Sequence, residues 1–401
     1  MEPSQPQLSI TVKNGHEILG YLVIDSTIGG RACGGLRLVP DVDEAEIAGL
    51  ARAMTLKFGY VSLPQGGGKS GVRGDPEAPR EERRQRLVAF AQAIAPLLRR
   101  GLYAPFSDMG IDNTDIRYML EAVGVRVKRR ELRGNNSGYY TALSVVAGIQ
   151  QGARHIGLDL SRATVAIEGF GKVGSALGGL LDAAGVKVVA VSTSRGALYN
   201  PHGLDINRLA ALARQMGSEF VQAYKEAEPL DRAALLELPV DVLCPCARHH
   251  TLHTGNAGRI AAKLISPGAN NPITTEAEQI LTERSVLCLP YFATNCGGAL
   301  GGTMEFAMHN RATIERVISQ QLGARIARLL QEAARQKKSP RELAEEESRR
   351  RFAAMQQAAE HPTLTGRLME LGLECHRRGW VPGVLIRRLS LSYFEKRAAA
   401  L

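Results

Sequence analysis

The chain has 401 residues, of which 44% are hydrophobic and 22% are charged, and its formal net charge is +10. This length is too great for one ordinary core, so we expect two domains with a ligand cleft between them. No stretch approaches the roughly 18 apolar residues of a membrane span, and the first residues, MEPSQPQLSI, lack the pattern of a signal peptide. We therefore expect a cytoplasmic protein without a membrane partner.

Basic residues are spread along the chain without a nucleic-acid-binding motif, which argues against nucleic acid as a partner. The positive charge then serves solubility or the steering of anionic small molecules. Six cysteines without regular spacing predict reduced thiols and no disulfides.

The N-terminal third predicts an α/β unit. Residues 8–13 and 18–25 read as two strands joined at Asn14-Gly15, a strong hairpin signal. Apolar residues at helical spacing from Glu44 predict a helix that carries Lys57, and a glycine turn over 66–68 is expected just before Lys69. A helix is predicted over 81–99, and LYAPFSDMG then predicts a short strand and a loop that carries Asp108.

Lys57 and Lys69 are the first sign of chemistry, and they stand twelve residues apart. A lysine in glycine-rich backbone beside apolar neighbours is partly desolvated, and a second cation crowds it. Both effects lower its pKa toward the range of a general base. The other lysine would stay charged and hold a carboxylate. The alternative without function is two surface lysines and, in Asp108, a helix-capping aspartate.

From about residue 140 the pattern changes to a helix (TALSVVAGIQQGARHIG), a strand (TVAIE), a glycine turn, a second helix and a strand (KVVAVS). This is a βαβ unit, and DVLCPC, KLISPGAN and SVLCLP predict further parallel strands. Beyond Thr303 the chain is helical, and RELAEEESRRRFAAMQQAAE predicts a solvated amphipathic helix.

The glycine turn GFGKVG lies between a predicted strand and a predicted helix, which is the context that a dinucleotide site requires. Gly169 permits the tight turn, Gly171 lets the backbone approach a pyrophosphate, and Gly174 allows the helix to pack on the strand. The alternative is a glycine turn without a ligand. The residues that we assign to the cofactor here are Gly169, Phe170, Gly171, Lys172, Val173 and Gly174.

An NAD site carries an acidic residue about 20 positions after this turn, where it accepts the ribose 2′-OH. This chain has Ser192, Thr193, Ser194 and Arg195 there instead. Small hydroxyls beside an arginine suit a 2′-phosphate, so NADP is weakly favoured over NAD.

Together the motifs resemble the glutamate, leucine, phenylalanine and valine dehydrogenase family, from about Gly34 to about Gly298. The matching pieces are GGLRL, AMTLK, GGGK with GDP, FSDMG, YYTAL, GFGKVG, GLD, DVLCPCA, SPGANNPIT and TNCGG. The resemblance implies two α/β domains. These are a substrate-binding and oligomerisation domain over 1–140 and a Rossmann NAD(P)-binding domain over 141–325, followed by C-terminal helices over 326–401 that pack across the hinge. It also implies a homo-oligomer.

The resemblance implies a role for each matching residue. Lys57 would bind the substrate α-carboxylate, Lys69 would be the general base, and Asp108 would exchange protons with the amino group. The implied reaction is the reversible NAD(P)-dependent oxidative deamination of an L-amino acid to a 2-oxo acid and ammonia. The residues expected on the cofactor side are Thr141, Ala247, Asn270 and Asn295. For the two asparagines, the alternative is that they only satisfy turn backbone.

Substrate choice is expected to depend on the pocket wall. Cys33 stands just before GGLR, where glutamate-specific members of the family carry a lysine, so glutamate is disfavoured and the chain resembles the leucine, phenylalanine and valine type more closely. A ring at Phe106 and space at Gly302 suit a bulky apolar or aromatic side chain, although Phe106 could also be core packing. The other residues assigned to the substrate are Gly34, Gly35, Met54 and Ala299.

Two departures from the family pattern, Pro290-Tyr291 in place of PD and the segment GNNSGYYTA, suggest specialised metabolism. One alternative is therefore a biosynthetic member of the family that acts on an unusual amino or oxo acid. Another is a catalytically silent nucleotide-binding regulator, against which the intact Lys57, Lys69 and Asp108 argue.

The segment CPCARHHTLH gathers Cys244, Cys246, His249, His250 and His253, which invites a zinc site. Its C-x-C spacing differs from that of structural zinc pairs, and no second cysteine pair lies nearby. We therefore predict no metal.

Overall fold

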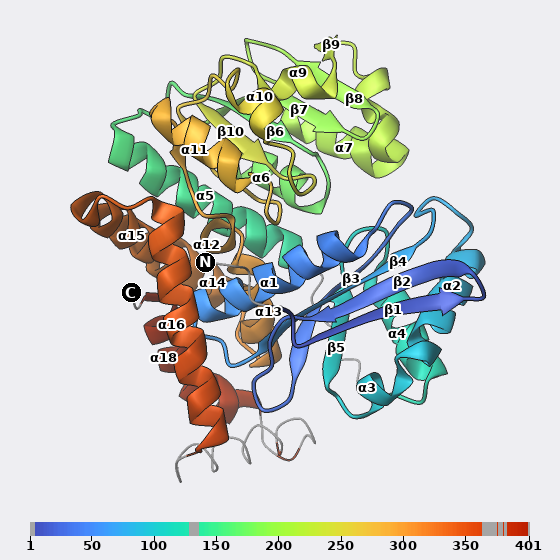
Figure 1. Cartoon of the computed structure of the whole chain (residues 1–401). Coiled ribbons are helices and arrows are strands. Elements are labelled where there is room, and N and C mark those ends of the chain that lie inside the picture. The colour runs from blue at the N-terminus through green and yellow to red at the C-terminus, as the bar shows by residue number, and fades with distance from the viewer. Residues whose placement is uncertain (1–4, 128–135, 363–374, 376–379, 381–382, 400–401) are drawn as a thin grey trace. The chain divides into compact units, whose positions relative to one another are not determined.

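The structure, a computed structural model, describes residues 5–127, 136–362, 375, 380 and 383–399 (Figure 1). The chain forms two compact units. Unit 1 comprises Met1–Asn135, Phe306–Met308 and Glu347–Arg388, and unit 2 comprises Asn136–Glu305, His309–Glu346 and Leu389–Leu401. Parts of the predicted domains 1–140 and 326–401 lie outside the described residues. None of the helices in the described part of the chain has the length and hydropathy needed to cross a bilayer.

Unit 1 is built on a five-stranded sheet with the order β1-β2-β4-β3-β5. β1 and β2 form the predicted antiparallel hairpin, with Gly15 at φ +62° in its turn. β4 and β5 both run parallel to β3. The strands are β1 (Leu8–Asn14), β2 (Glu17–Ile24), β3 (Ala32–Val39), β4 (Gly66–Arg73) and β5 (Tyr103–Ser107).

The predicted glycine turn before Lys69 was wrong, because the three glycines begin the buried strand β4. A Cβ at Gly67 would lie 2.4 Å from the backbone nitrogen of Thr55, and one at Gly68 would lie 3.1 Å from the Tyr103 ring. The glycines are thus required by close packing of a helix and a ring on the strand, not by a turn. Lys69 consequently lies in the middle of a sheet.

Helix α1 (Glu44–Tyr60), which begins at the N-cap Asp43, packs on one face of this sheet. The other face is covered by α2 (Arg80–Ala93), α3 (Ala95–Arg99) and α4 (Asn113–Ala122). The predicted single helix over 81–99 is therefore two helices. The break falls at Ile94, just before Pro96, which lacks an N–H and is tolerated only in the first turn of a helix.

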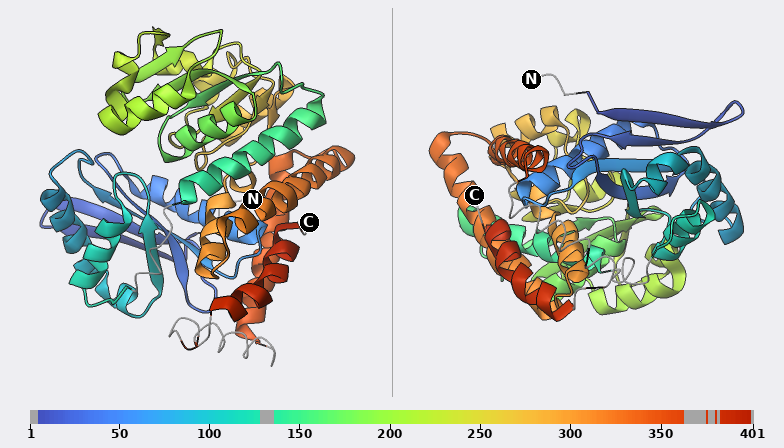
Figure 2. Two further views of the ribbon diagram at one scale, coloured as in Figure 1. Left: turned by 180° about the vertical axis from the view of Figure 1, so that it is seen from behind. Right: turned by 90° about the horizontal axis from the view of Figure 1, so that it is seen from below.

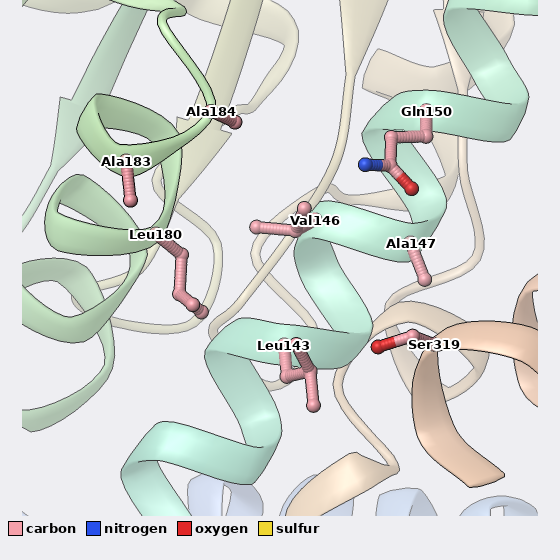
Figure 3. Close-up of a pocket in the computed structure, with 8 residues that line it drawn as sticks. All are labelled: Leu143, Val146, Ala147, Gln150, Leu180, Ala183, Ala184 and Ser319. Atoms are coloured by element: carbon pink, nitrogen blue, oxygen red, sulfur yellow. The ribbon is translucent and has the colours of Figure 1, made fainter. Parts of the chain in front are cut away.

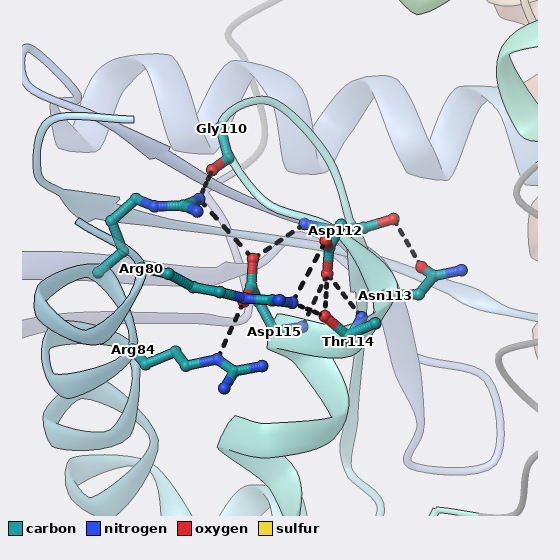
Figure 4. A network of polar contacts seen from close by, with 9 residues as sticks. Arg80, Arg84, Gly110, Asp112, Asn113, Thr114 and Asp115 are labelled. Carbon is teal, nitrogen blue, oxygen red and sulfur yellow. Dashed lines mark hydrogen bonds and ion pairs between the residues drawn. The ribbon is translucent and has the colours of Figure 1, made fainter. Parts of the chain in front are cut away.

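The start of α4 is fastened to α2 by the polar network of Figure 4. The Asp112 carboxylate accepts hydrogen bonds from the backbone of Thr114 (2.7 Å) and Asp115 (2.9 Å), which caps the helix. The buried Asp115 in turn pairs with Arg84 (3.3 Å) and Arg80 (3.4 Å) of α2. This network holds the segment that leads from Asp108 to α4.

Unit 2 is built on a seven-stranded sheet with the order β12-β11-β10-β6-β7-β8-β9. The predicted βαβ unit and further parallel strands are present, since β12, β11, β10, β6 and β7 are parallel. β8 and β9 add an antiparallel edge that the sequence analysis did not predict. The strands are β6 (Thr164–Glu168), β7 (Lys187–Thr193), β8 (Gly196–Tyr199), β9 (Glu228–Leu230), β10 (Val242–Pro245), β11 (Leu264–Ile265) and β12 (Leu287–Cys288).

Helices cover both faces of this second sheet (Figure 2). On one face, α9 (Arg232–Leu236), α10 (Thr254–Ala257) and α11 (Thr275–Glu283) pack on apolar strand residues. On the other face lie α5 (Ser137–Ile156) and α6 (Lys172–Ala183). Short elements link β8 to β9: α7 (Ile206–Met216), the single turn η1 (Gly217–Glu219) and α8 (Phe220–Ala223).

The part of the C-terminal third that the structure describes is mainly helical, as predicted. Its helices are α12 (Tyr291–Thr294), α13 (Gly297–Phe306), α14 (Arg311–Arg316), the π-helical turn η2 (Val317–Leu322), α15 (Gly323–Gln336), α16 (Pro340–Glu360) and α18 (Gly383–Ala399). The predicted solvated amphipathic helix is α16, and its apolar side is buried at Leu343, Ala344 and Phe352.

Candidate active site and cofactor-binding site

Lys69 of the central strand β4 and Asp108, which directly follows β5, meet through their side chains in unit 1. The Lys69 Nζ lies 2.5 Å from the Asp108 Oδ2, and the Lys69 side chain is 3% exposed whereas the Asp108 side chain is 24% exposed. Asp108 follows β5 and precedes the N-cap Asp112 of α4, so it is not the helix cap. Both alternatives without function, a surface lysine and a capping aspartate, are therefore excluded for these two residues.

A second pair of charges completes this cluster. Arg37 of β3 donates to the Asp108 Oδ2 through Nε (3.1 Å) and Nη2 (2.9 Å), and it also pairs with the buried Glu46 of α1. Neither Arg37 nor Glu46 was predicted from the sequence to belong to the site. Arg37 belongs to the quoted motif GGLRL, and its place two residues after Gly35, on the same face of β3, was the signal that could have revealed it.

Burial is the largest influence on Lys69, and it lowers the pKa of the ammonium group below the ordinary 10.5. The Asp108 carboxylate opposes this shift, while the like charge of Arg37, which pairs with the same carboxylate, adds to it. The crowding cation is thus Arg37, whereas the sequence analysis expected Lys57. Burial alone would raise the pKa of Asp108, but Lys69 and Arg37 outweigh it and hold that pKa well below its usual range.

Two glycines make room for this cluster. A Cβ at Gly35 would lie 2.8 Å from the Lys69 Nζ and 2.9 Å from the Asp108 Cβ. A Cβ at Gly34 would lie 1.6 Å from the carbonyl oxygen of Gly68 and 3.5 Å from the Met54 side chain. Met54 therefore borders the glycine pair from α1.

Lys57 lies one helical turn after Met54, on the same face of α1. It is 8% exposed, so the surface-lysine alternative fails for it as well. Arg37 and Lys69 bring two basic side chains to the carboxylates of Asp108 and Glu46, and Lys57 belongs to α1, the helix that carries Glu46. Basic side chains in this part of unit 1 suit an anionic ligand.

Cys33 and Phe106 lie on the same face of the sheet as Lys69. The Cys33 thiol donates to the Gln65 side chain (2.8 Å), and Phe106 pairs with Gly35 across β3 and β5. Phe106 is 47% exposed and so is not part of the core of unit 1. The remaining predicted substrate residues, Ala299 and Gly302, lie in unit 2 on α13, and a Cβ at Gly302 would meet nothing within 4 Å.

The glycine turn joins β6 to α6 in unit 2, as predicted. Gly169 has φ +92°, and a Cβ there would lie 2.8 Å from that of Ala247, so only glycine fits. A Cβ at Gly174 would lie 1.8 Å from the Gly169 carbonyl oxygen, whereas at Gly171 it would meet nothing within 4 Å. Open backbone at the N-terminus of α6 fits the pyrophosphate of a dinucleotide.

The side chains around the turn divide into structural and accessible ones. Phe170 is buried against Phe220, with ring centroids 5.5 Å apart, so only its backbone faces the turn. Lys172 is exposed and Val173 half-buried, both in the first turn of α6.

The end of β7 also meets this turn. The buried Ser192 hydroxyl accepts the Gly169 N–H (2.9 Å), and its carbonyl accepts the Phe170 N–H (2.6 Å). Ser192 therefore shapes the turn, and Thr193, Ser194 and Arg195 extend beyond it.

The loop after β10 completes the edge of the sheet at the point where the strand order reverses. Ala247 stands against Gly169 there, which is the place where open α/β sheets bind ligands. Beneath the loop lies Glu168, whose side chain accepts from the Ala247 N–H (3.4 Å) and Thr251 (3.5 Å). Burial raises the pKa of Glu168 to about 7. The sequence analysis did not single out Glu168, although it directly precedes the glycine turn.

The two asparagines lie together at the same edge. The Asn295 Nδ2 donates to the carbonyls of Ala269 (2.8 Å) and Gly268 (3.3 Å) and to the Asn270 side chain (3.0 Å). Within the described part of the chain, the buried Asn295 Oδ1 has no hydrogen-bond partner. Asn295 thus satisfies turn backbone and still offers an acceptor to a bound group. Thr141, in the second turn of α5, packs against Gly298.

The histidines of CPCARHHTLH serve local structure. The His253 Nδ1 accepts the Gly255 N–H and caps α10, and His250 bonds to the Asn271 side chain (2.9 Å). Within the described ranges, no three His, Cys, Asp or Glu side chains are grouped as a metal site. All six cysteines are free thiols.

A cavity of about 250 Å³ lies elsewhere in unit 2, between α5, α6 and η2 (Figure 3). Only Gln150 and Ser319 bring polar side chains to it, and none of the predicted site residues lines it. The lining residues are Leu143, Val146, Ala147, Gln150, Leu180, Ala183, Ala184 and Ser319.

Comparison with known families covers both units. Residues 4–124 match the model described as Glu/Leu/Phe/Val dehydrogenase, dimerisation domain, and residues 135–361 match that of Glutamate/Leucine/Phenylalanine/Valine dehydrogenase. Similar curated proteins include a glutamate dehydrogenase of Thermotoga maritima (35% identity over 309 residues) and an NAD-specific glutamate dehydrogenase of Staphylococcus aureus (33% over 304 residues). Each of these alignments covers 73% of both chains.

Solved structures agree on the fold. A hetero-hexameric glutamate dehydrogenase from Thermus thermophilus, in a Leu-bound form, is 25% identical, with a TM-score of 0.75 over 90% of both chains. An L-tryptophan dehydrogenase from Nostoc punctiforme is 21% identical, with a TM-score of 0.59 over 87% of this chain and 96% of that one. The chain therefore belongs to the glutamate/leucine/phenylalanine/valine dehydrogenase family and is an oxidoreductase, an amino acid dehydrogenase with a Rossmann-type domain.

Proposed function

We propose that the chain catalyses the reversible NAD(P)-dependent oxidative deamination of an L-amino acid with a bulky apolar or aromatic side chain. The observation that carries this proposal is the buried Lys69, in contact with Asp108 and with a pKa below its ordinary value. A buried lysine of lowered pKa is suited to base catalysis at moderately alkaline pH.

Each of the three side chains then has a defined role in the reaction. The Lys57 ammonium binds the substrate α-carboxylate, and Asp108 accepts a proton from the amino group. The glycine turn from Gly169 to Gly174 would hold NAD(P), which when bound would supply the acceptor for the hydride from the substrate Cα. Lys69, as the neutral amine, takes a proton from the water that adds to the resulting iminium carbon. Asp108 returns a proton to the nitrogen of the carbinolamine. The C–N bond then breaks, the carbinol hydroxyl gives its proton to the departing ammonia, and the products are ammonium and the 2-oxo acid.

The substrate class follows from three positions. Cys33 offers a thiol rather than a cation, so the side-chain carboxylate of glutamate would lack a partner there. Phe106 of unit 1 presents an exposed ring, and Gly302 of unit 2 leaves open space beside α13; each by itself suits a large apolar side chain. On this basis we place the chain nearer to the leucine, phenylalanine and valine enzymes, although the similar curated proteins are glutamate dehydrogenases.

We propose that the enzyme has a weak preference for NADP over NAD as its cofactor. Thr193, Ser194 and Arg195 stand at the end of β7, where a 2′-phosphate would lie, and no carboxylate belongs to that strand end. We also propose that Asn270 and Asn295 orient the bound cofactor, since the Asn295 Oδ1 offers an acceptor.

The test is nicotinamide absorbance at alkaline pH, with each protein amino acid offered separately with NAD and with NADP. We expect reduction with one or a few bulky apolar amino acids and a modest advantage for NADP. Glutamate as the best substrate would contradict the substrate class. A tenfold or greater preference for NAD in kcat/KM would contradict the cofactor choice.

A further inference from the structure

The hairpin after β7 presents Arg195 on a rigid support. Thr193 pairs with Gly196, so Ser194 and Arg195 form a two-residue tip between β7 and β8. The Arg195 N–H donates to the Thr193 hydroxyl (3.1 Å), which holds the tip close to the strand end. The Arg195 side chain is 56% exposed and accessible to a ligand.

A carboxylate reaches this tip from a distant part of the sequence. Glu219 stands 24 residues after Arg195, yet its Oε1 lies 2.8 Å from the Arg195 Nε. The turn η1 carries Glu219, and the Thr193 hydroxyl donates to the Ser218 carbonyl (2.9 Å). The next residue, Phe220, packs on Phe170 of the glycine turn. Glu219 is therefore anchored to the elements that would surround the adenosine ribose.

We propose that Glu219 is a specificity-determining residue that opposes the 2′-phosphate of NADP by competing for Arg195. This inference rests on the proposed function to the extent that a dinucleotide binds at the glycine turn. A guanidinium has five N–H donors, so Arg195 can hold Glu219 through Nε while its terminal nitrogens face a ligand. With NAD the ion pair remains undisturbed. With NADP the dianionic phosphate meets the Glu219 carboxylate as a like charge.

The effect has a definite size and direction. Exposed ion pairs couple by up to about 1 kcal/mol, which corresponds to about a fivefold change in affinity. Glu219→Gln is therefore expected to raise the ratio of NADPH to NADH affinity about fivefold, and Arg195→Ala is expected to lower it. Glu219→Asp should restore most of the wild-type ratio. Added salt should reduce the difference between wild type and Glu219→Gln, because these charges are exposed.

The experiment measures NADPH and NADH binding to the full-length protein by nucleotide fluorescence, so it does not depend on turnover. The matched control is Glu237→Gln, which removes another partly exposed carboxylate paired with an arginine, Arg259. Glu237 lies at the amino-terminal edge of the sheet, before β10, so this variant should leave the ratio unchanged. A double variant of Glu219 and Arg195 tests the competition, because Glu219→Gln should have a smaller effect without the guanidinium.

The experiment distinguishes a failure of the proposed function from a failure of the inference about Glu219. If wild type binds neither nucleotide, the proposed function fails and the inference falls with it. If both nucleotides bind and Glu219→Gln leaves the ratio unchanged, or alters it equally with and without Arg195, the inference alone is overturned.

Discussion

Gly35 leaves the space in which a buried lysine and a partly exposed carboxylate can meet. Any side chain there would displace the Lys69 Nζ or the Asp108 Cβ, which would lie within 3 Å of its first atom. Arg37 occupies the other side of the carboxylate, so Asp108 is shared between two cations. A cation that shares its carboxylate partner with a second cation loses its proton more readily, and this is what a general base requires.

Lys69 is the residue whose loss should matter most. We expect Lys69→Ala and Lys69→Arg each to lower kcat about 100-fold or more, because alanine removes the base and arginine cannot deprotonate. In the wild type, the deamination rate should rise with pH up to a pKa below 10.5, since only the neutral amine accepts a proton. Steady-state kinetics across pH measure both effects.

Lys263 provides the control for that experiment. It is an exposed lysine paired with Asp241 at the amino-terminal edge of the unit 2 sheet, so Lys263→Ala should retain full turnover. Unchanged turnover in Lys69→Ala would rule out the proposed mechanism.

Glu168 should make the stability of the protein depend on pH. Its folded-state pKa of about 7 lies above the ordinary 4.5, chiefly because of burial, so the folded state binds the proton more tightly. The resulting stabilisation is fully present below about pH 4.5 and is lost as the pH rises through 7. Over that window it amounts to about 3 kcal/mol, since each pKa unit is worth about 1.4 kcal/mol.

Glu168→Gln should therefore gain stability relative to wild type between pH 5 and pH 8, because the amide does not ionise. Chemical denaturation at the two pH values measures this difference. Glu237→Gln, which changes a carboxylate whose pKa lies below its ordinary value, should show no such gain. If the difference between wild type and Glu168→Gln is the same at both pH values, Glu168 does not titrate in this range.

At the scale of elements, helix α13 has glycines with opposite roles. A Cβ at Gly301 would lie 2.4 Å from the ring of Tyr140, which is buried in α5. A Cβ at the adjacent Gly302 would meet nothing within 4 Å. The first glycine lets two helices pack closely, and the second leaves the outer side of the helix open.

This contrast predicts different outcomes for neighbouring substitutions. Gly301→Ala should destabilise the protein by about 1–3 kcal/mol through overpacking. Gly302→Ala should be neutral or stabilising, because alanine is the better helix former. Gly302→Val should lower kcat/KM for the largest accepted amino acid more than for a small one. Thermal unfolding and a comparison of two substrates measure these effects, and an unchanged substrate ranking in Gly302→Val would remove Gly302 from the pocket.

At the scale of the whole molecule, residues 4–124 match a domain described by its role in dimerisation. We therefore expect a homo-oligomer in solution, with a mass that is a multiple of the monomer mass. Sedimentation velocity at the concentrations used for the activity assays measures it. A fully active monomer at those concentrations would contradict the expectation.

The sequence by itself determined much of the architecture. The hairpin, the βαβ unit and the glycine turn GFGKVG have local signals, because they depend on residues a few positions apart, and these elements form where predicted. Lys57, Lys69, Asp108 and the glycine turn could be singled out for the same reason, since each lies within a short motif of restricted chemistry.

The tertiary structure decided what depends on close approach between distant segments. The three glycines before Lys69 suggest a turn, yet they begin a strand. Glycine is needed in that strand because α1 and the Tyr103 ring leave no room for a Cβ. The cation that crowds Lys69 proved to be Arg37, brought there by strand pairing and not by proximity in sequence. Glu219 likewise reaches Arg195 across 24 residues. Local patterns specify which element forms, whereas packing specifies which side chains share a carboxylate, and that sharing governs the chemistry of the site.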